Sequence, residues 1–303
     1  MFTTDAHCDT LCEIAVVGTP AEKCCVTPER LRKGNVCLQT FAMFTSMRSA
    51  DPYAEARAML DAYKRLPIPR IDGKLPENPP TVPTAVLSSE GGEQFQGKIE
   101  RLAEFDDDAR LRLIALTWNY ANEIGTPAAV NADDGLTPFG FEFLREMDRR
   151  GICADVSHLN EAGFWDVIDR AEVPPVASHS DCRWLCEHPR NLKKEQVKAL
   201  IERKGFIGVN FFSTFLNENS EATIEDVLNN IDEICQMGGE EIVGFGSDFD
   251  GISIWPEGLA NPSDFPALIE RLRGRGYSQT ALEKIAGLNY WRVLKTADAM
   301  RRA

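Results

Sequence analysis

Short apolar runs alternate with amphipathic segments along nearly the whole chain. The runs are typical of buried parallel strands, and the segments between them carry apolar residues at helical spacing. The strand-like runs cover residues 2–6, 35–44, 84–88, 111–117, 151–156, 173–178, 205–211 and 241–246. The helix-like segments cover residues 51–65, 94–104, 140–150, 160–170, 192–203, 221–237, 262–275 and 278–299. The alternation predicts an α/β fold in which a parallel sheet closes into a (β/α)8 TIM barrel.

Three features lie outside this alternation. Residues 66–83 are rich in proline and lack periodicity, which predicts a loop. Residues 106–108 are three consecutive aspartates, which predict a solvated acidic turn. Glu93 follows two glycines after the third strand-like run, and a glutamate in such a position is expected to be solvated.

Length and charge limit the classes of function. A chain of 303 residues is within the range of a single barrel domain, here residues 1–303, and its 43% hydrophobic content allows a large core. The formal net charge of -14 argues against nucleic acid and anionic membranes as partners, because phosphate-binding surfaces need clustered Lys and Arg. A small-molecule substrate is the expected partner.

The first residues and the cysteines indicate the compartment. The opening MFTTDAHCDT lacks the basic and apolar regions of a leader, and no run approaches the roughly 18 apolar residues of a membrane span. The nine cysteines are scattered and odd in number, which favours reduced thiols over a disulfide framework. A cytoplasmic protein is expected.

The candidate chemistry is concentrated where predicted strands end. His158 and His179 follow the fifth and sixth strand-like runs, and His7 and Asp9 follow the first. Glu90 stands just beyond the third run. Taken alone, Asp9 could cap the next segment and His7 could hydrogen-bond within a loop. In a TIM barrel, however, the carboxyl ends of all strands converge on one mouth, so these five side chains are predicted to share a site.

The donor set predicts a metal centre. Three imidazoles and two carboxylates exceed the ligands of one tetrahedral zinc with an open position, and they suit two metals with Glu90 between them. Without a counter-ion, so many polar side chains facing each other would be costly to bury. Imidazole and carboxylate ligands favour two Zn²⁺ per chain, with manganese, cobalt or iron as alternatives.

Six short motifs in order resemble the membrane dipeptidase (renal dipeptidase) family of metallopeptidases, within the amidohydrolase-like TIM barrels. They are DAHCDT, SSEGG, DVSH, SHS, HPRN and GFGSDFDG, and the resemblance extends over about residues 4–291. It implies that His7 and Asp9 bind one metal, that His158 and His179 bind the other, and that Glu90 bridges the two.

The resemblance also implies an activity and its further residues. Arg190 of HPRN would hold the substrate carboxylate, a role that suits a guanidinium because it can form two parallel hydrogen bonds. Asp248 would transfer the proton from the attacking water to the departing amine, while Asp250 would support the turn. The implied reaction is hydrolysis of dipeptides by a metal-bridged hydroxide, including dipeptides with a carboxyl-terminal D-residue. Relatives of this kind are often homodimers.

Two positions depart from the family pattern. Trp118 stands where relatives of the mammalian enzyme have a histidine that contacts the substrate carbonyl, which leaves Asn119 or the metals to stabilise the oxyanion. Phe212 stands where a tyrosine is common. Trp118 motivates an alternative, the same metal barrel acting on a lactam, lactone or N-acyl amino acid. A non-catalytic metal-binding protein is a third possibility, which the full set of ligands and Asp248 disfavours.

Overall fold

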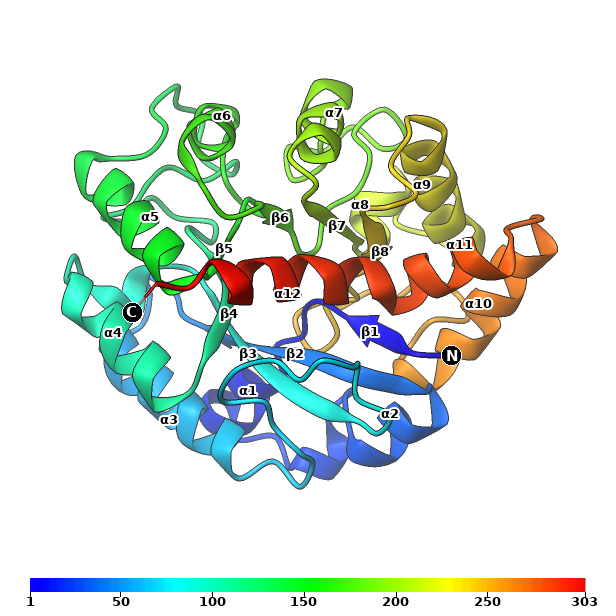
Figure 1. The fold of residues 1–303 in the computed structure, drawn as a ribbon, viewed down its shortest axis with the longest axis horizontal. Helices are drawn as coiled ribbons and strands as arrows, with labels where there is room; N and C mark the ends of the chain where they lie inside the picture. The colour runs from blue at the N-terminus through cyan, green and yellow to red at the C-terminus, as the bar shows by residue number, and fades with distance from the viewer. Residues whose placement is uncertain (303) are drawn as a thin grey trace.

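The computed structural model describes residues 1–302 and contains an eight-stranded parallel barrel (Figure 1). The strands follow each other around the barrel in chain order. Their bounds are β1 (Thr3–Asp5), β2 (Val36–Phe44), β3 (Thr84–Glu90), β4 (Leu111–Ala115), β5 (Cys153–Asp155), β6 (Val176–Ala177), β7 (Phe206–Val209) and β8 (Val243–Phe245). The backbone N–H of Ala6 donates to the carbonyl of Phe245 at 3.0 Å and joins the last strand to the first. The predicted TIM barrel is confirmed.

Helices surround the strands, as the ring of coils in Figure 1 shows. The main ones are α3 (Pro52–Lys64), α4 (Ile99–Asp108), α5 (Pro138–Arg150), α6 (Glu161–Arg170), α7 (Lys194–Glu202), α9 (Ile224–Gln236), α10 (Phe265–Gly274) and α12 (Asn289–Met300). Shorter ones are α1 (Thr10–Cys12), α2 (Pro28–Lys33), α8 (Ser213–Leu216) and α11 (Gln279–Glu283). Several begin where a side chain caps the first turn; Thr137 and Asn160, for example, accept from Gly140 and Gly163.

Helix α12 closes the end of the barrel at which the strands begin, and it crosses the centre of Figure 1. Tyr290 lies fully buried against Phe206 of β7, with ring centroids 4.8 Å apart, and its hydroxyl is 2.7 Å from Thr40 Oγ1 of β2. Asp298 accepts hydrogen bonds from Arg110 and Arg112 at the start of β4. Because this end is filled by side chains, the functional site can open only at the other end.

One local prediction was wrong, and a second was right only in part. The segment 94–104 is not one helix, because Gln96 and Gly97 have φ values of 48° and 66° and separate a 3-10 turn (Glu93–Phe95) from α4. The three aspartates form the last turn of α4, in which Asp107 and Asp108 are exposed as predicted but Asp106 is not. Asp106 is buried, and its carboxylate accepts from Arg150 and Arg301. These cations come from distant segments, so sequence periodicity gave no sign of them.

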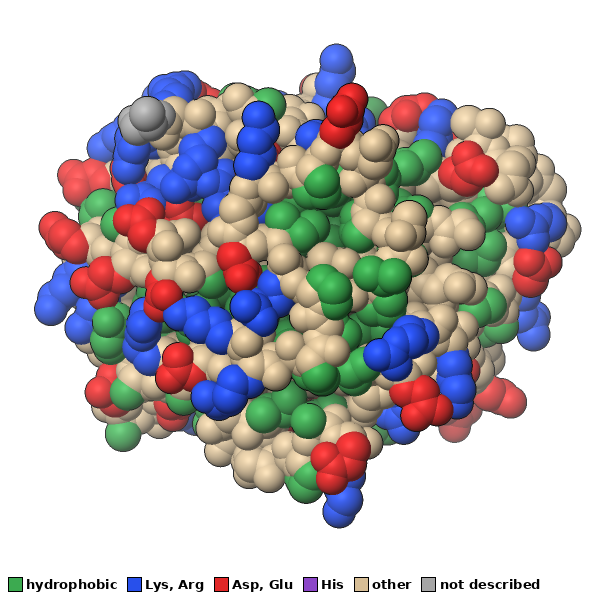
Figure 2. All heavy atoms as spheres, turned by 60° about the horizontal axis from the view of Figure 1, so that its bottom comes forward, with side chains coloured by type: hydrophobic (Ala, Val, Ile, Leu, Met, Phe, Trp, Pro, Cys, Tyr) green, Lys and Arg blue, Asp and Glu red, His purple; other side chains and the backbone are tan. Residues whose placement is uncertain are grey.

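The surface carries interspersed charges of both signs. Figure 2 shows acidic and basic side chains around apolar atoms on one face and no histidine there, in keeping with the burial of His7, His158 and His179. Within residues 1–302, no helix has both the length and the apolar composition that crossing a membrane requires. The nine cysteines are free thiols.

Candidate metal and active site

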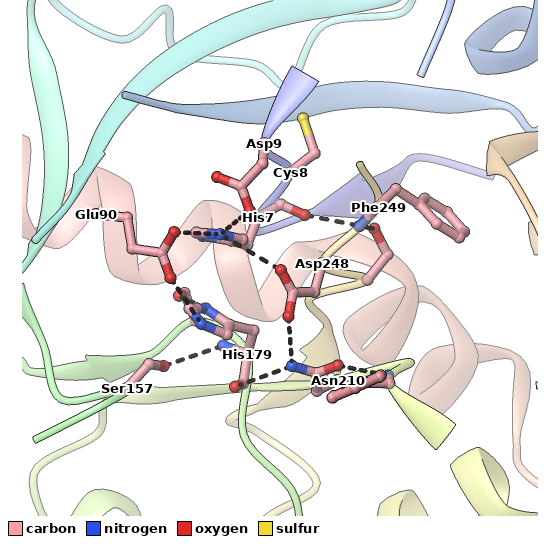
Figure 3. Close-up of polar contacts among 12 residues, drawn as sticks. His7, Cys8, Asp9, Glu90, Ser157, His179, Asn210, Asp248 and Phe249 are labelled. Atoms are coloured by element: carbon pink, nitrogen blue, oxygen red, sulfur yellow. Dashed lines mark hydrogen bonds and ion pairs between the residues drawn. The ribbon is translucent and has the colours of Figure 1, made fainter. Parts of the chain in front are cut away.

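The carboxyl ends of the strands bring the predicted site residues together (Figure 3). His7 and Asp9 follow β1, Glu90 is the last residue of β3, and His158 and His179 follow β5 and β6. All five side chains are buried. The parallel register explains this convergence, since β3 pairs with β2 and β4 up to Glu90 itself.

Glu90 lies at the centre, with its two oxygens facing different imidazoles. Its Oε1 is 2.8 Å from His158 Nε2 and 3.5 Å from His179 Nε2. Its Oε2 is 3.6 Å from His7 Nε2, on the other side of the carboxylate. One carboxylate thus connects two groups of nitrogen donors, which is the arrangement of a bridging ligand.

A second group of carboxylates surrounds His7. Its Nε2 is 3.5 Å from Asp9 Oδ2 and 3.8 Å from Asp248 Oδ1, and the atom has no hydrogen-bond partner among the described residues. Burial alone would lower the pKa of His7, but the charges of Glu90 and Asp9 raise it well above its usual value. The pKa of Asp9 is raised well above its usual value by burial and by the charge of Glu90. Both shifts show that a positive charge beside them would stabilise the buried carboxylates of this site.

His158 and His179 are held in the neutral form that metal ligands require. Burial and the nearby Arg190 lower the pKa of His158 to about 4. Burial and the charge of His7 lower the pKa of His179 well below its usual value. Their Nε2 atoms face each other at 3.0 Å. Two neutral imidazoles at this separation, next to a carboxylate whose pKa is well below normal, fit a divalent cation between them.

Each of these histidines is oriented by a contact to its other ring nitrogen. Asn119 Oδ1 lies 3.1 Å from His158 Nδ1, so the amide fixes the ring and leaves Nε2 free to bind. Ser178 Oγ lies 2.7 Å from His179 Nδ1 and also hydrogen-bonds the buried carboxylate of Asp155. These partners were not predicted as such. The motifs did contain two of these partners, because Asp155 is the first residue of DVSH and Ser178 is the first residue of SHS.

The turn after β8 places Asp248 beside the candidate ligand His7. Asp248 and Asp250 have φ values of 63° and 69°, in the left-handed region that Asp tolerates better than most residues. Asp250 accepts hydrogen bonds from Thr10 Oγ1 and Cys25 N, both at 2.6 Å, which supports the predicted structural role. Asn210 Nδ2 donates to Asp248 Oδ2 at 3.0 Å and leaves Oδ1 directed at His7.

Arg190 is buried in the same site. Its guanidinium lies 5.6 Å from the centre of the Phe215 ring, and its Nη2 is 3.5 Å from the carbonyl of His179. Its Nε has no partner among residues 1–302. Burial lowers the pKa of Arg190, opposed by the charges of Asp248 and Glu90. A buried cation with free donor capacity is suited to an anionic substrate group.

Comparison with known proteins agrees with this geometry. The family model for membrane dipeptidases, peptidase family M19, matches residues 81–303. The chain belongs to this family.

Curated relatives and solved structures support the assignment. An uncharacterized protein of Klebsiella pneumoniae is 37% identical over 220 residues, covering 69% of this chain and 80% of that protein. An uncharacterized dipeptidase of Schizosaccharomyces pombe is 34% identical over 71% of this chain, which spans about half of that relative's length (53%). A Rhodobacter sphaeroides metallopeptidase liganded with a phosphinate mimic of L-Ala-D-Ala has the same fold, with a TM-score of 0.86, 24% identity and coverage of 98% and 99% of the two chains. Membership in the dipeptidase family indicates a peptide-bond hydrolase that depends on metal.

The mouth of this dipeptidase-family barrel is a cavity of about 350 Å³, whose lining includes the candidate ligands Asp9, Glu90 and His158. Trp118 lines it together with Phe44 and Phe212, and the polar lining includes Arg190 and Asp248. The indole of Trp118 packs edge-on against Phe44, with centroids 4.8 Å apart. Trp118 is therefore part of the wall of this cavity.

The side chain of Glu93 is buried, which the sequence interpretation did not predict. It was expected in solvent, yet its side chain is buried behind the turn that follows Glu90, and both its oxygens lack a hydrogen-bond partner among the described residues. Burial raises the pKa of Glu93 to about 7. The tight turn at Gly91, with φ of 86°, folds the chain back and carries Glu93 inward.

Glu93→Gln is expected to stabilise the protein in a pH-dependent way. A folded-state pKa raised from 4.5 to about 7 means that folding takes up a proton, so stability is lost as the pH rises between these values. The shift corresponds to about 3 kcal/mol, a cost present above pH 7 and absent below about 4.5. Chemical unfolding at pH 5 and pH 8 measures it; Glu77→Gln, at an exposed glutamate, is the matched control. An equal gain at both pH values would contradict the assignment.

Proposed function

We propose that the protein is a dinuclear zinc dipeptidase that cleaves short peptides with a free carboxylate, including dipeptides with a carboxyl-terminal D-residue. One observation carries the proposal. The two oxygens of Glu90 face separate groups of imidazoles, 2.8 Å from His158 on one side and 3.6 Å from His7 on the other. The phosphinate dipeptide mimic bound by the Rhodobacter sphaeroides relative supports a dipeptide as the substrate.

The buried donor atoms fit two cations. His7 and Asp9 would hold one metal, His158 and His179 the other, and Glu90 both. Closely spaced ligand atoms occur in two overlapping groups, one of His7, Glu90 and His179 and one of His7, Asp9 and Asp248. Nε2 of His7 and Oδ1 of Asp9 are buried polar atoms without a hydrogen-bond partner in the described part of the chain, and a bound cation would satisfy them. Imidazole and carboxylate donors suit zinc.

The residues around the proposed ligands would bind the substrate, transfer the proton and orient a ligand. When bound, the metals would lower the pKa of a water molecule and polarise the scissile carbonyl. Arg190 would hold the substrate carboxylate through its guanidinium, whose Nε has no partner within residues 1–302. Asp248 would take a proton at Oδ1, since Asn210 holds Oδ2, and would return it to the departing amine. Asn119 would orient His158, because its amide oxygen is already engaged by that ring.

Hydrolysis of a dipeptide panel is expected to depend on metal. Exhaustive chelation should abolish turnover, and added Zn²⁺ should restore it with about two ions bound per chain. The measurements are metal content by elemental analysis and release of free amino acids from L,L- and L,D-dipeptides. Full metal occupancy without turnover on any dipeptide would overturn the proposal.

A second candidate is hydrolysis of a lactam, lactone or N-acyl amino acid by the same barrel. Trp118 favours it, because an indole N–H can donate a hydrogen bond but cannot supply the charge of a histidine. Comparing Trp118→His with the parent chain separates the two functions. If turnover of dipeptides appears only in the variant, the native substrate belongs to the second class.

A further inference from the structure

The wall of the mouth above β2 and β4 is aromatic. Phe44 ends β2, Trp118 follows β4, and their rings pack edge-on at 4.8 Å. Tyr120 extends the group, with its centroid 5.6 Å from that of Trp118. The indole also lies 6.4 Å from the His158 ring, so the aromatic group reaches the edge of the ligand set.

Phe44, at one end of this wall, stands across the mouth from the proposed carboxylate anchor, and Trp118, after β4, lies about a quarter turn of the barrel from each. The strands follow chain order around a closed barrel of eight, so β2 lies opposite β6. Phe44 ends β2, whereas Arg190 belongs to the loop after β6, and both line the same cavity. The proposed metal ligands Asp9, Glu90 and His158 line that cavity as well. A dipeptide whose carboxylate meets Arg190 and whose scissile bond lies over these ligands must extend its amino-terminal residue toward Phe44.

We infer that Trp118, packed against Phe44, selects dipeptides whose amino-terminal residue has a large apolar side chain. The inference rests on the proposed dipeptidase function and adds the substrate class. An apolar side chain laid on two aromatic rings leaves water, and offset or edge contacts between rings add to the gain. An amino-terminal glycine or charged residue would gain no binding free energy from contact with these rings. Trp118 thereby acts as a specificity-determining residue.

The preference should appear as a difference in kcat/KM between matched dipeptides. With the zinc-loaded protein, Phe-Ala and Leu-Ala are expected to exceed Gly-Ala by about 10- to 100-fold, the range that apolar pocket contacts provide. Trp118→Ala should reduce this ratio by about 10-fold, while Trp118→Phe should retain most of it. In the reversed series, Ala-Phe against Ala-Gly, Trp118→Ala should leave the ratio unchanged.

Trp165 provides a matched control for Trp118. Trp165 lies on α6, outside the mouth, and Trp165→Ala should keep the parent ratio in both series. Equal turnover of Phe-Ala and Gly-Ala by the parent, or an effect of Trp118→Ala confined to the reversed series, would overturn the inference while leaving the dipeptidase function intact. No turnover of any dipeptide at full metal occupancy would overturn the proposed function itself, and the inference with it.

Discussion

Replacing Asp248 with asparagine is expected to lower kcat for dipeptide hydrolysis by about 100- to 10,000-fold, the usual contribution of a positioned general base and acid. The substitution keeps the shape of the side chain and its contact with Asn210 Nδ2 through the remaining oxygen. It removes the ability of Oδ1 to take up and return a proton. Burial, together with the charge of Glu90, raises the pKa of Asp248 to about 6, which suits a group that exchanges protons near neutrality.

Metal content distinguishes a proton shuttle from a metal ligand. The Asp248→Asn protein should bind the same number of zinc ions as the parent, because the five proposed ligands are unchanged by the substitution. Asp61→Asn, on the exposed face of α3, is the matched control and should change neither quantity. An unchanged kcat would remove Asp248 from the mechanism. A loss of zinc would make it a ligand instead.

The sequence predicted those features that follow from the apolar runs together with the geometry of a parallel barrel. Apolar runs marked all eight strands, and a parallel barrel necessarily brings the strand ends to one mouth. That is why His7, Glu90, His158 and His179, which are remote in sequence, could be predicted to meet. The strand bounds were less certain, since β5 and β6 are much shorter than the apolar runs that contain them.

Contacts that depend on the direction of a side chain could not be predicted from the sequence. Asn119 lines the cavity, where it was expected to serve the substrate, but the contact of its amide oxygen with His158 Nδ1 at 3.1 Å was not foreseen. The burial of Asp106 depends on Arg150 and Arg301, which approach it from other elements. Glu93 turns inward because of a backbone conformation at Gly91 that no local pattern specifies. In each case the partner or the turn lies outside the periodic elements that can be recognised in a sequence.

Replacing Arg190 with lysine is expected to lower kcat/KM for dipeptides by about 30- to 150-fold, equivalent to the 2–3 kcal/mol of a charge-assisted pair of hydrogen bonds. Lysine retains the charge but loses the planar fork that can engage both carboxylate oxygens. It also loses the stacking of the guanidinium over Phe215. The effect should be concentrated in binding and orientation of the substrate, with zinc content unchanged.

A substrate without the carboxylate provides the control for this assignment. For a dipeptide amide, the parent enzyme should already lack the benefit of the guanidinium, so Arg190→Lys should change kcat/KM by less than about threefold. The two substitutions, one in the protein and one in the substrate, form a cycle whose coupling measures the contact directly. If Arg190→Lys impaired the acid and the amide equally, Arg190 would act by shaping the loop after β6, next to the carbonyl of His179, and the substrate carboxylate would have another partner.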